Sequence, residues 1–156
     1  MCIRDRSNNG AWAMPDTTDN TIRLAQSPMR SASVFNFFRP RYSPPVTELA
    51  RRGQVAPELQ ITDETSIAGY LNFLAIYVDR GWEDLQTNYA AEIALARDPA
   101  ALVARVALLL AGDAFSSATA NAIAQAVATL PPERPRDRVR AAIMLVAASP
   151  EYLVQK

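Results

Sequence analysis

Apolar side chains recur at helical spacing through most of residues 62–156, and this periodicity constrains the fold more than any other feature of the sequence. Most of the apolar runs begin near a residue that commonly caps a helix N-terminus, and most end at a glycine or a proline. No alternation of apolar and polar residues long enough for a strand occurs after residue 60. The sequence therefore predicts an all-α protein in which residues 62–156 form a small helical bundle with short connections.

The capping residues predict where the helices begin and end. Thr62 is expected to cap a helix whose first turn carries two acidic residues, which suit the positive end of the helix dipole. Asp98 followed by Pro99 predicts a second start, because proline fits the first helical position. The other predicted boundaries, in chain order, are an end at Gly81, a start at Glu83–Asp84, an end at Gly112, a start at Ser116 or Ser117, an end at Pro131–Pro132, a start at Asp137, an interruption at Ser149–Pro150 and a last turn over Glu151–Val154.

Residues 27–61 form the least regular part of the sequence. Prolines remove backbone donors and disfavour helix in the preceding residue. The segment also carries three phenylalanines and Tyr42, more aromatic residues than a disordered linker would hold. We predict an ordered loop braced by prolines and laid over a core, with a short helix from Val46 to Arg52 that stops at Gly53.

The first 26 residues divide into two parts. Back-translation of residues 1–6 resembles a transposon-end adapter of sequencing libraries, so we interpret these residues as adapter-derived and expect the protein's own N-terminal part to lie upstream. For the same reason, we expect any signal peptide to lie outside the given sequence. Residues 7–26 are predicted to be a polar lead-in with a short helix from Thr21 to Gln26.

Composition excludes several functions. The chain has 156 residues, which corresponds to one domain or to a piece of a larger one. It has 16 basic and 16 acidic residues, so no whole-chain field favours nucleic acid, and we predict no nucleic-acid partner. It has no histidine, which excludes serine–histidine catalysis and histidine-bound metals within this chain. We predict no cofactor, no metal site and no membrane span.

One stretch carries a family resemblance. Residues 26–40 read QSPMRSASVFNFFRP, residues 55–61 read VAPELQI, and the chain ends with an ASPEYLVQ motif over residues 148–155. Across roughly residues 20–156 the sequence resembles the C-terminal part of the bacterial family called domain of unknown function 1800. The resemblance implies a largely helical, exported protein with no established activity, several times longer than a small domain. Its partners would be the missing N-terminal part, the product of a neighbouring gene or a polysaccharide.

Position 41 departs from the pattern expected of this family. Relatives are expected to have glycine after the Arg-Pro pair, whereas this chain has Arg41. Glycine permits a backbone angle that arginine resists, so we expect the turn to be altered.

Four candidate binding residues lie around the aromatic cluster. Together with Arg41, Arg30 and Arg39 could form an anion or carbohydrate subsite, because guanidinium groups bind anions and aromatic faces bind sugars or cations. Asn36 and Tyr42 are the polar members of the same stretch. The structural alternative is that the phenylalanines fill the core, the arginines pair with carboxylates or cap carbonyls, and Asn36 satisfies loop backbone.

Two acidic residues are further candidates. Glu58 and Glu64, with Asp63 between them, could provide paired carboxylates for glycoside hydrolysis or hold a calcium ion. The alternative is a helix start with its first-turn acids and a Glu58 side chain paired with an arginine. No calcium-loop spacing is present.

Other singled-out residues have simpler interpretations. Trp82 is expected to be core rather than a sugar platform. The basic run Arg134, Arg136, Arg138 and Arg140 is interpreted as a solvated loop and helix start, since acidic residues interleave and no aromatic platform accompanies it.

Two functional hypotheses remain from the sequence. In the first, this region scaffolds or binds a polysaccharide or a protein partner, and the aromatic segment packs against the upstream part. In the second, it belongs to an exported hydrolase-like enzyme, with Arg30, Arg39, Glu58 and Glu64 lining one wall of a cleft. The first is preferred, because the chain has neither a nucleophile–base pair nor a metal-binding set.

Overall fold

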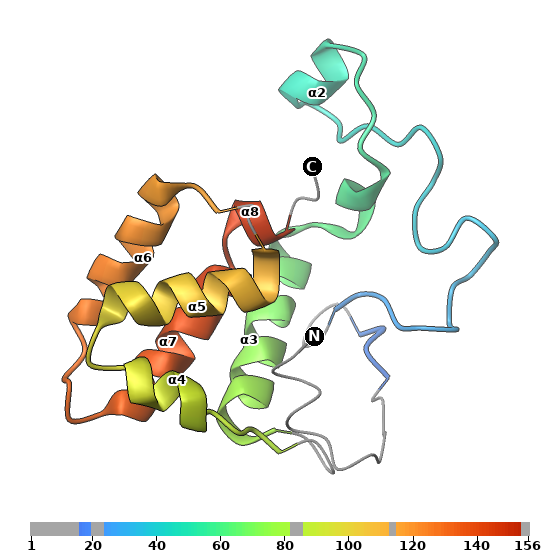
Figure 1. Cartoon of the computed structure of the whole chain (residues 1–156). Helices are drawn as coiled ribbons and strands as arrows, with labels where there is room; N and C mark the ends of the chain where they lie inside the picture. The colour runs from blue at the N-terminus through green and yellow to red at the C-terminus, as the bar shows by residue number, and fades with distance from the viewer. Residues whose placement is uncertain (1–15, 20–23, 82–85, 113–114, 154–156) are drawn as a thin grey trace. The chain divides into compact units, whose positions relative to one another are not determined.

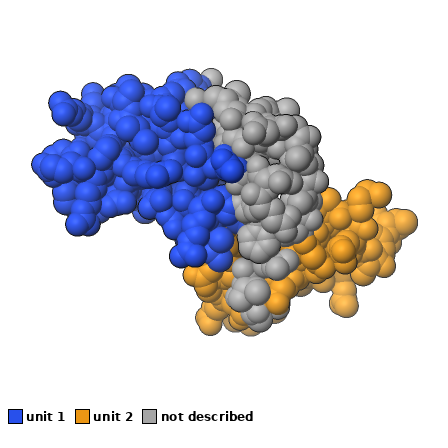
Figure 2. Space-filling model, turned by 90° about the horizontal axis from the view of Figure 1, so that it is seen from below, with its two compact units in different colours: residues 1–13, 75–156 blue, residues 14–74 orange. Residues whose placement is uncertain are grey.

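A computed structural model describes residues 16–19, 24–81, 86–112 and 115–153. The chain divides into two compact units, which Figure 2 shows in different colours. Among the described residues, unit 1 contains those from residue 75 onward and unit 2 contains those up to residue 74. Helix α3 (Glu64–Arg80) runs across the boundary in sequence.

Unit 1 is built on a helical core. Its helices are α4 (Ala90–Leu95), α5 (Pro99–Ala111), α6 (Ser117–Ala128), α7 (Pro135–Ala147) and the short α8 (Pro150–Leu153). Helices α5, α6 and α7 pack against one another, α4 packs on α5 and α7, and α8 contacts the same two helices (Figure 1). Leu102, Val106, Val127, Val139 and Val146 are completely buried between them. The predicted all-α class is confirmed, and the described residues contain no strand.

The helix starts follow from local capping chemistry. Asp98 accepts hydrogen bonds from the backbone N–H groups of Ala100 and Ala101 at 3.0 and 3.1 Å, and Pro99 is the first residue of α5, as predicted. The same helix ends at Gly112, which has a φ of +60°, a value that suits glycine. Ser116 caps α6 through the N–H of Thr119, which confirms the predicted start.

Two predicted caps are wrong. Asp63, rather than Thr62, caps α3: its carboxylate accepts from the N–H of Ser66 at 2.7 Å, and the Ser66 hydroxyl accepts from the N–H of Asp63 at 2.9 Å. Thr62 instead follows the preceding 3₁₀ helix η1 (Pro57–Ile61). Helix α7 begins at Pro135, so Asp137 lies in its first turn and does not cap it.

Other boundaries also need correction. Helix α4 begins at Ala90, later than the start predicted from Glu83–Asp84, which lies outside the described residues together with Trp82. Helix α6 ends at Ala128, three residues before the prolines. The chain turns at Ala148 and Ser149, and α8 begins at Pro150.

Unit 2 is mostly irregular. It contains α2 (Glu48–Arg51), η1 and a series of turns. Helix α2 is shorter than predicted, because it is capped by Thr47 and the predicted first residue, Val46, lies in a turn. Residues 24–26 are not helical, and the remainder of the helix predicted from Thr21 lies outside the described residues.

Candidate functional site

Residues 27–56, which we name the turn segment, contain a repeated turn. Hydrogen bonds join the N–H of Arg30 to the carbonyl of Ser27 at 3.3 Å and the N–H of Tyr42 to the carbonyl of Arg39 at 3.1 Å. Proline occupies the second position of both turns. A third turn, at residues 44–47, also has proline in its second position but is closed by a side chain, because the hydroxyl of Thr47 donates to the carbonyl of Pro44 at 2.7 Å. Because proline fixes a negative φ, these turns pre-order the chain.

The third residue of each turn has a left-handed backbone. Met29, Arg41 and Val46 have φ values of 62°, 64° and 62°. A positive φ in the residue after proline is a feature of type II turns, whose third position favours glycine or asparagine. None of the three is glycine, so each turn carries steric strain of roughly 1–2 kcal/mol. Arg41 thus adopts the backbone angle that suits glycine, so the altered turn expected from the sequence is not what the structure shows.

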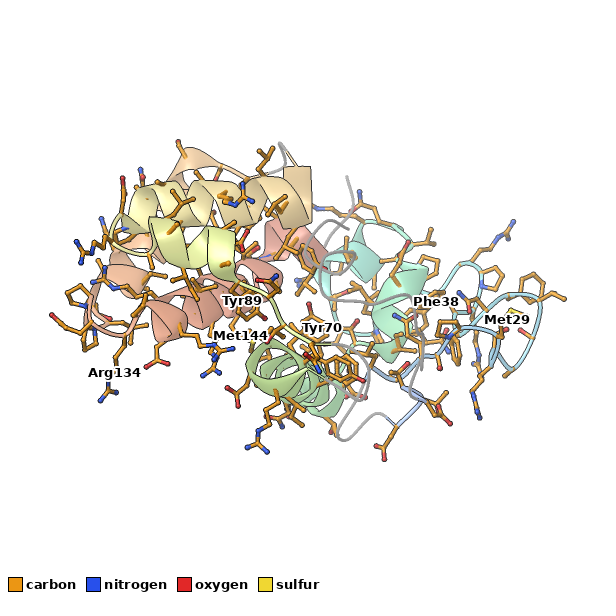
Figure 3. All side chains as sticks on the ribbon, turned by 60° about the horizontal axis from the view of Figure 1, so that its bottom comes forward. Met29, Phe38, Tyr70, Tyr89, Arg134 and Met144 are labelled. Carbon is orange, nitrogen blue, oxygen red and sulfur yellow. The ribbon has the colours of Figure 1, made fainter. Side chains whose placement is uncertain are left out.

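The turn segment leaves large apolar side chains in solvent. Met29, Val34 and Val46 are almost fully exposed, and Phe35 is 59% exposed. Figure 3 shows Met29 on the loop that the turn segment forms. The interpretation that the phenylalanines fill a core is therefore wrong for Phe35. An ordered segment that exposes this much apolar surface is typical of an interaction site.

The six candidate residues all lie in unit 2, but no described interaction joins two of their side chains. Arg30 pairs with Asp16 at 3.0 Å, as its structural alternative anticipated. Asn36 closes a turn by donating its N–H to the carbonyl of Ser33 at 3.1 Å, so it serves loop backbone. Arg39 is exposed, and its backbone N–H donates to the side-chain carbonyl of Gln60 at 2.6 Å.

The remaining candidates serve secondary structure. Tyr42 is half-buried, and its carbonyl accepts from the N–H of Ala56 at 2.8 Å, which closes the base of the turn segment. Glu58 lies in the first turn of η1, and Glu64 is the first residue of α3. Both glutamates are exposed, and no described ion pair joins Glu58 to an arginine. The described contacts therefore do not assemble the acid pair that glycoside hydrolysis needs.

The basic run of α7 is divided between surface and interior. Arg134 and Arg136 are exposed, and Figure 3 shows Arg134 at the edge of the bundle. Arg138 is buried, and its guanidinium donates to the carbonyl of Leu130 at 3.0 and 2.7 Å and to that of Ala96 at 3.0 Å. The interpretation of this run as a solvated face is therefore wrong for Arg138.

Arg140 also has a structural role. It forms an ion pair with the carboxylate of Asp79 and donates to the carbonyl oxygen of the same residue at 3.2 Å. The hydroxyl of Tyr89 donates to the neighbouring carbonyl of Val78 at 2.9 Å. Burial raises the pKa of Tyr89 to about 12, although the charge of Arg140 opposes the rise. These contacts hold the end of α3 against the bundle within unit 1.

A buried carboxylate lies in the same unit. Glu92 of α4 is completely buried, and its Oε1 accepts from the Nε of Arg105 of α5 at 2.9 Å. Neither residue of this pair stands out in the sequence by a motif, although a glutamate in an alanine-rich helix is a visible signal. Among the described residues, no group of three or more potential ligands could hold a metal ion. No helix within the described ranges is both long and apolar enough to cross a membrane.

The fold and the turn segment together define an all-α protein with a segment of turns that exposes apolar side chains. A family model described as "protein of unknown function (DUF1800)" matches residues 3–154. The chain belongs to this family, which confirms the resemblance found in the sequence. No curated protein and no solved structure matches the chain significantly.

Proposed function

We propose that the turn segment binds another polypeptide and that the helical bundle is a structural part of the same protein. The observation that carries the proposal is the exposure of Met29, Val34, Phe35 and Val46 on a segment whose backbone is ordered by turns. Apolar side chains displayed on a pre-ordered backbone lose little conformational entropy when they are covered, which favours binding.

The favoured partner is the part of the protein encoded upstream of this region. The family resemblance implies a longer protein, and an upstream helical part would offer the apolar surface that these side chains need. A product of a neighbouring gene and a polysaccharide are the other partners that the resemblance suggests. Aromatic stacking on a sugar would use Phe35 but would leave the aliphatic Met29 and Val46 without a role.

Binding to the upstream polypeptide tests this proposal directly. The upstream reading frame is obtained by a long read through the gene, expressed separately and titrated with the 156-residue chain by calorimetry. Replacing Met29, Val34 and Phe35 with serine should weaken binding roughly tenfold or more. The matched control replaces Leu108 and Leu153 with serine, because these exposed apolar residues belong to the bundle.

Three results would overturn the proposal. The upstream polypeptide could fail to bind, the control could weaken binding as much as the turn variant, or a soluble polysaccharide could bind the segment while the polypeptide does not. A gene with no coding sequence upstream would remove the favoured partner.

We also propose that the whole protein is exported. The family resemblance is the sole support for this location. A cleavable signal peptide at the start of the upstream frame would support export, and a frame that starts without one would contradict it.

A further inference from the structure

The turn segment is strongly basic in a chain whose charges balance. Residues 27–56 contain five arginines and a single acidic residue, Glu48, which gives a net charge of +4. The rest of the chain is correspondingly acidic, since the total is zero. This concentration of positive charge coincides with the exposed apolar side chains.

Three of the five arginines form local ion pairs, but two of the three share a single carboxylate. Arg30 pairs with Asp16, and Arg51 and Arg52 both pair with Glu48 at 2.9 Å. No ion pair with another described residue involves Arg39 or Arg41. Arg39 and Arg41 therefore carry most of the charge that these pairs leave uncompensated, and the rest lies on the Arg51 and Arg52 pair that shares Glu48.

The backbone of this turn is held at several points. The turn closes between Tyr42 and Arg39, the N–H of Arg39 binds Gln60, and the carbonyl of Tyr42 accepts from Ala56. Both guanidinium groups nevertheless remain exposed. The backbone of Arg41 has a φ of 64°, an angle at which glycine would avoid steric strain. The structure thus presents two charges on a fixed backbone within the same segment that exposes the apolar side chains.

We infer that the turn segment recognises an acidic polypeptide surface, and that Arg39 and Arg41 determine this specificity by pairing with its carboxylates. This inference rests on the proposed function, because it names the chemistry of the partner. Guanidinium groups bind carboxylates through paired hydrogen bonds, and charges at the rim of an apolar contact select partners by complementarity.

The chain offers a matched control for this inference. Arg134-Pro135-Arg136 repeats the same tripeptide on the bundle, and both of its arginines are exposed. The test titrates a fluorescent random copolymer of glutamate and tyrosine with the 156-residue chain, and compares a copolymer of lysine and tyrosine. The R39Q/R41Q and R134Q/R136Q variants remove equal charge from the two sites. Heparin is included as a polyanion of another chemical class.

The expected result is preferential binding of the glutamate copolymer. R39Q/R41Q should weaken it by roughly threefold to tenfold and flatten its salt dependence, whereas R134Q/R136Q should leave both unchanged. The charge reversal R39E/R41E should transfer the preference to the lysine copolymer. Circular dichroism of each variant confirms that the helices are retained.

Other outcomes overturn the inference. Equal losses in both double variants would show non-specific attraction, and tighter binding of heparin through the same arginines would point to a carbohydrate polyanion. Calorimetric titration with the upstream polypeptide distinguishes failure of this inference from failure of the proposed function. If binding of the upstream polypeptide depends on Met29, Val34 and Phe35 but not on the arginines, the turn segment is a binding site but its partner is not selected by acidic residues.

Discussion

Replacement of Arg138 by methionine tests how the bundle is held together. The buried guanidinium of Arg138 donates three hydrogen bonds, two to the carbonyl of Leu130 and one to that of Ala96. Leu130 follows the end of α6, and Ala96 is the C-cap of α4. The side chain therefore joins two helix C-termini to α7, where a positive charge is also favoured by the helix dipoles.

The magnitude follows from these contacts. Methionine retains much of the apolar stem but leaves the two carbonyls without this donor. Hydrogen bonds from a charged group contribute about 1.5–3 kcal/mol each, and they are not independent. We expect Arg138→Met to reduce the free energy of unfolding by about 3–5 kcal/mol, a large part of the stability of a typical domain.

Urea unfolding followed by far-ultraviolet circular dichroism measures this loss. The control is Arg136→Met, which removes the same charge from an exposed position on the same helix and should change stability by less than about 0.5 kcal/mol. Arg138→Lys should be intermediate, because an ammonium group cannot reproduce the planar fork of donors. A loss below about 1 kcal/mol for Arg138→Met, or equal losses at both positions, would show that these hydrogen bonds do not hold the bundle together.

Three further predictions concern strain, ionisation and burial. Val46→Gly should stabilise unit 2 by roughly 1 kcal/mol, because it removes the steric strain of a positive φ. Val34→Gly should destabilise the same unit, because Val34 does not have a positive φ. Amide hydrogen exchange over the turn segment distinguishes the two variants. The unfolded state loses the Tyr89 proton near pH 10 and the folded state near pH 12, because burial raises the pKa of this tyrosine. The free energy of unfolding should therefore fall by roughly 2 kcal/mol between these pH values. Urea unfolding at graded pH measures this fall, which Tyr89→Phe should abolish. Arg105→Met should cost roughly 3 kcal/mol in the same assay, because it removes the ion pair of the buried Glu92 carboxylate; a change below 1 kcal/mol would contradict this.

The sequence predicted helix ends well where one residue carries the signal. Asp98 with Pro99 and the terminal Gly112 were predicted correctly, because capping depends on chemistry within a few residues. Where two residues that can cap a helix are adjacent, which of them becomes the N-cap depends on a hydrogen-bond partner later in the helix. Asp63 is selected over Thr62 by its reciprocal bonds with Ser66, three residues later.

The buried charges could not be predicted in the same way. Arg138 meets Ala96 across 42 residues of sequence, and Arg140 meets Asp79 across 61. Their burial depends on how helices distant in sequence pack, and a local pattern of arginines and acids carries no information about that packing. The same limit explains the error at Phe35, because its aromatic character predicts burial only if a surface within the described chain covers it.

The strain and the exposure of the turn segment lead to the same conclusion from independent observations. Left-handed residues such as Met29, Arg41 and Val46 persist only where their surroundings determine the backbone, and the prolines and the turn hydrogen bonds provide that determination. These bonds explain how the shape is held, but they do not explain why exposed apolar and basic side chains occupy positions that suit glycine. The binding surface that we propose would supply this reason, since a strained but fixed backbone presents the side chains without further loss of entropy. Binding of such a surface should reduce hydrogen exchange in the turn segment more than in α5–α7, because the apolar residues of these helices are already buried in the bundle.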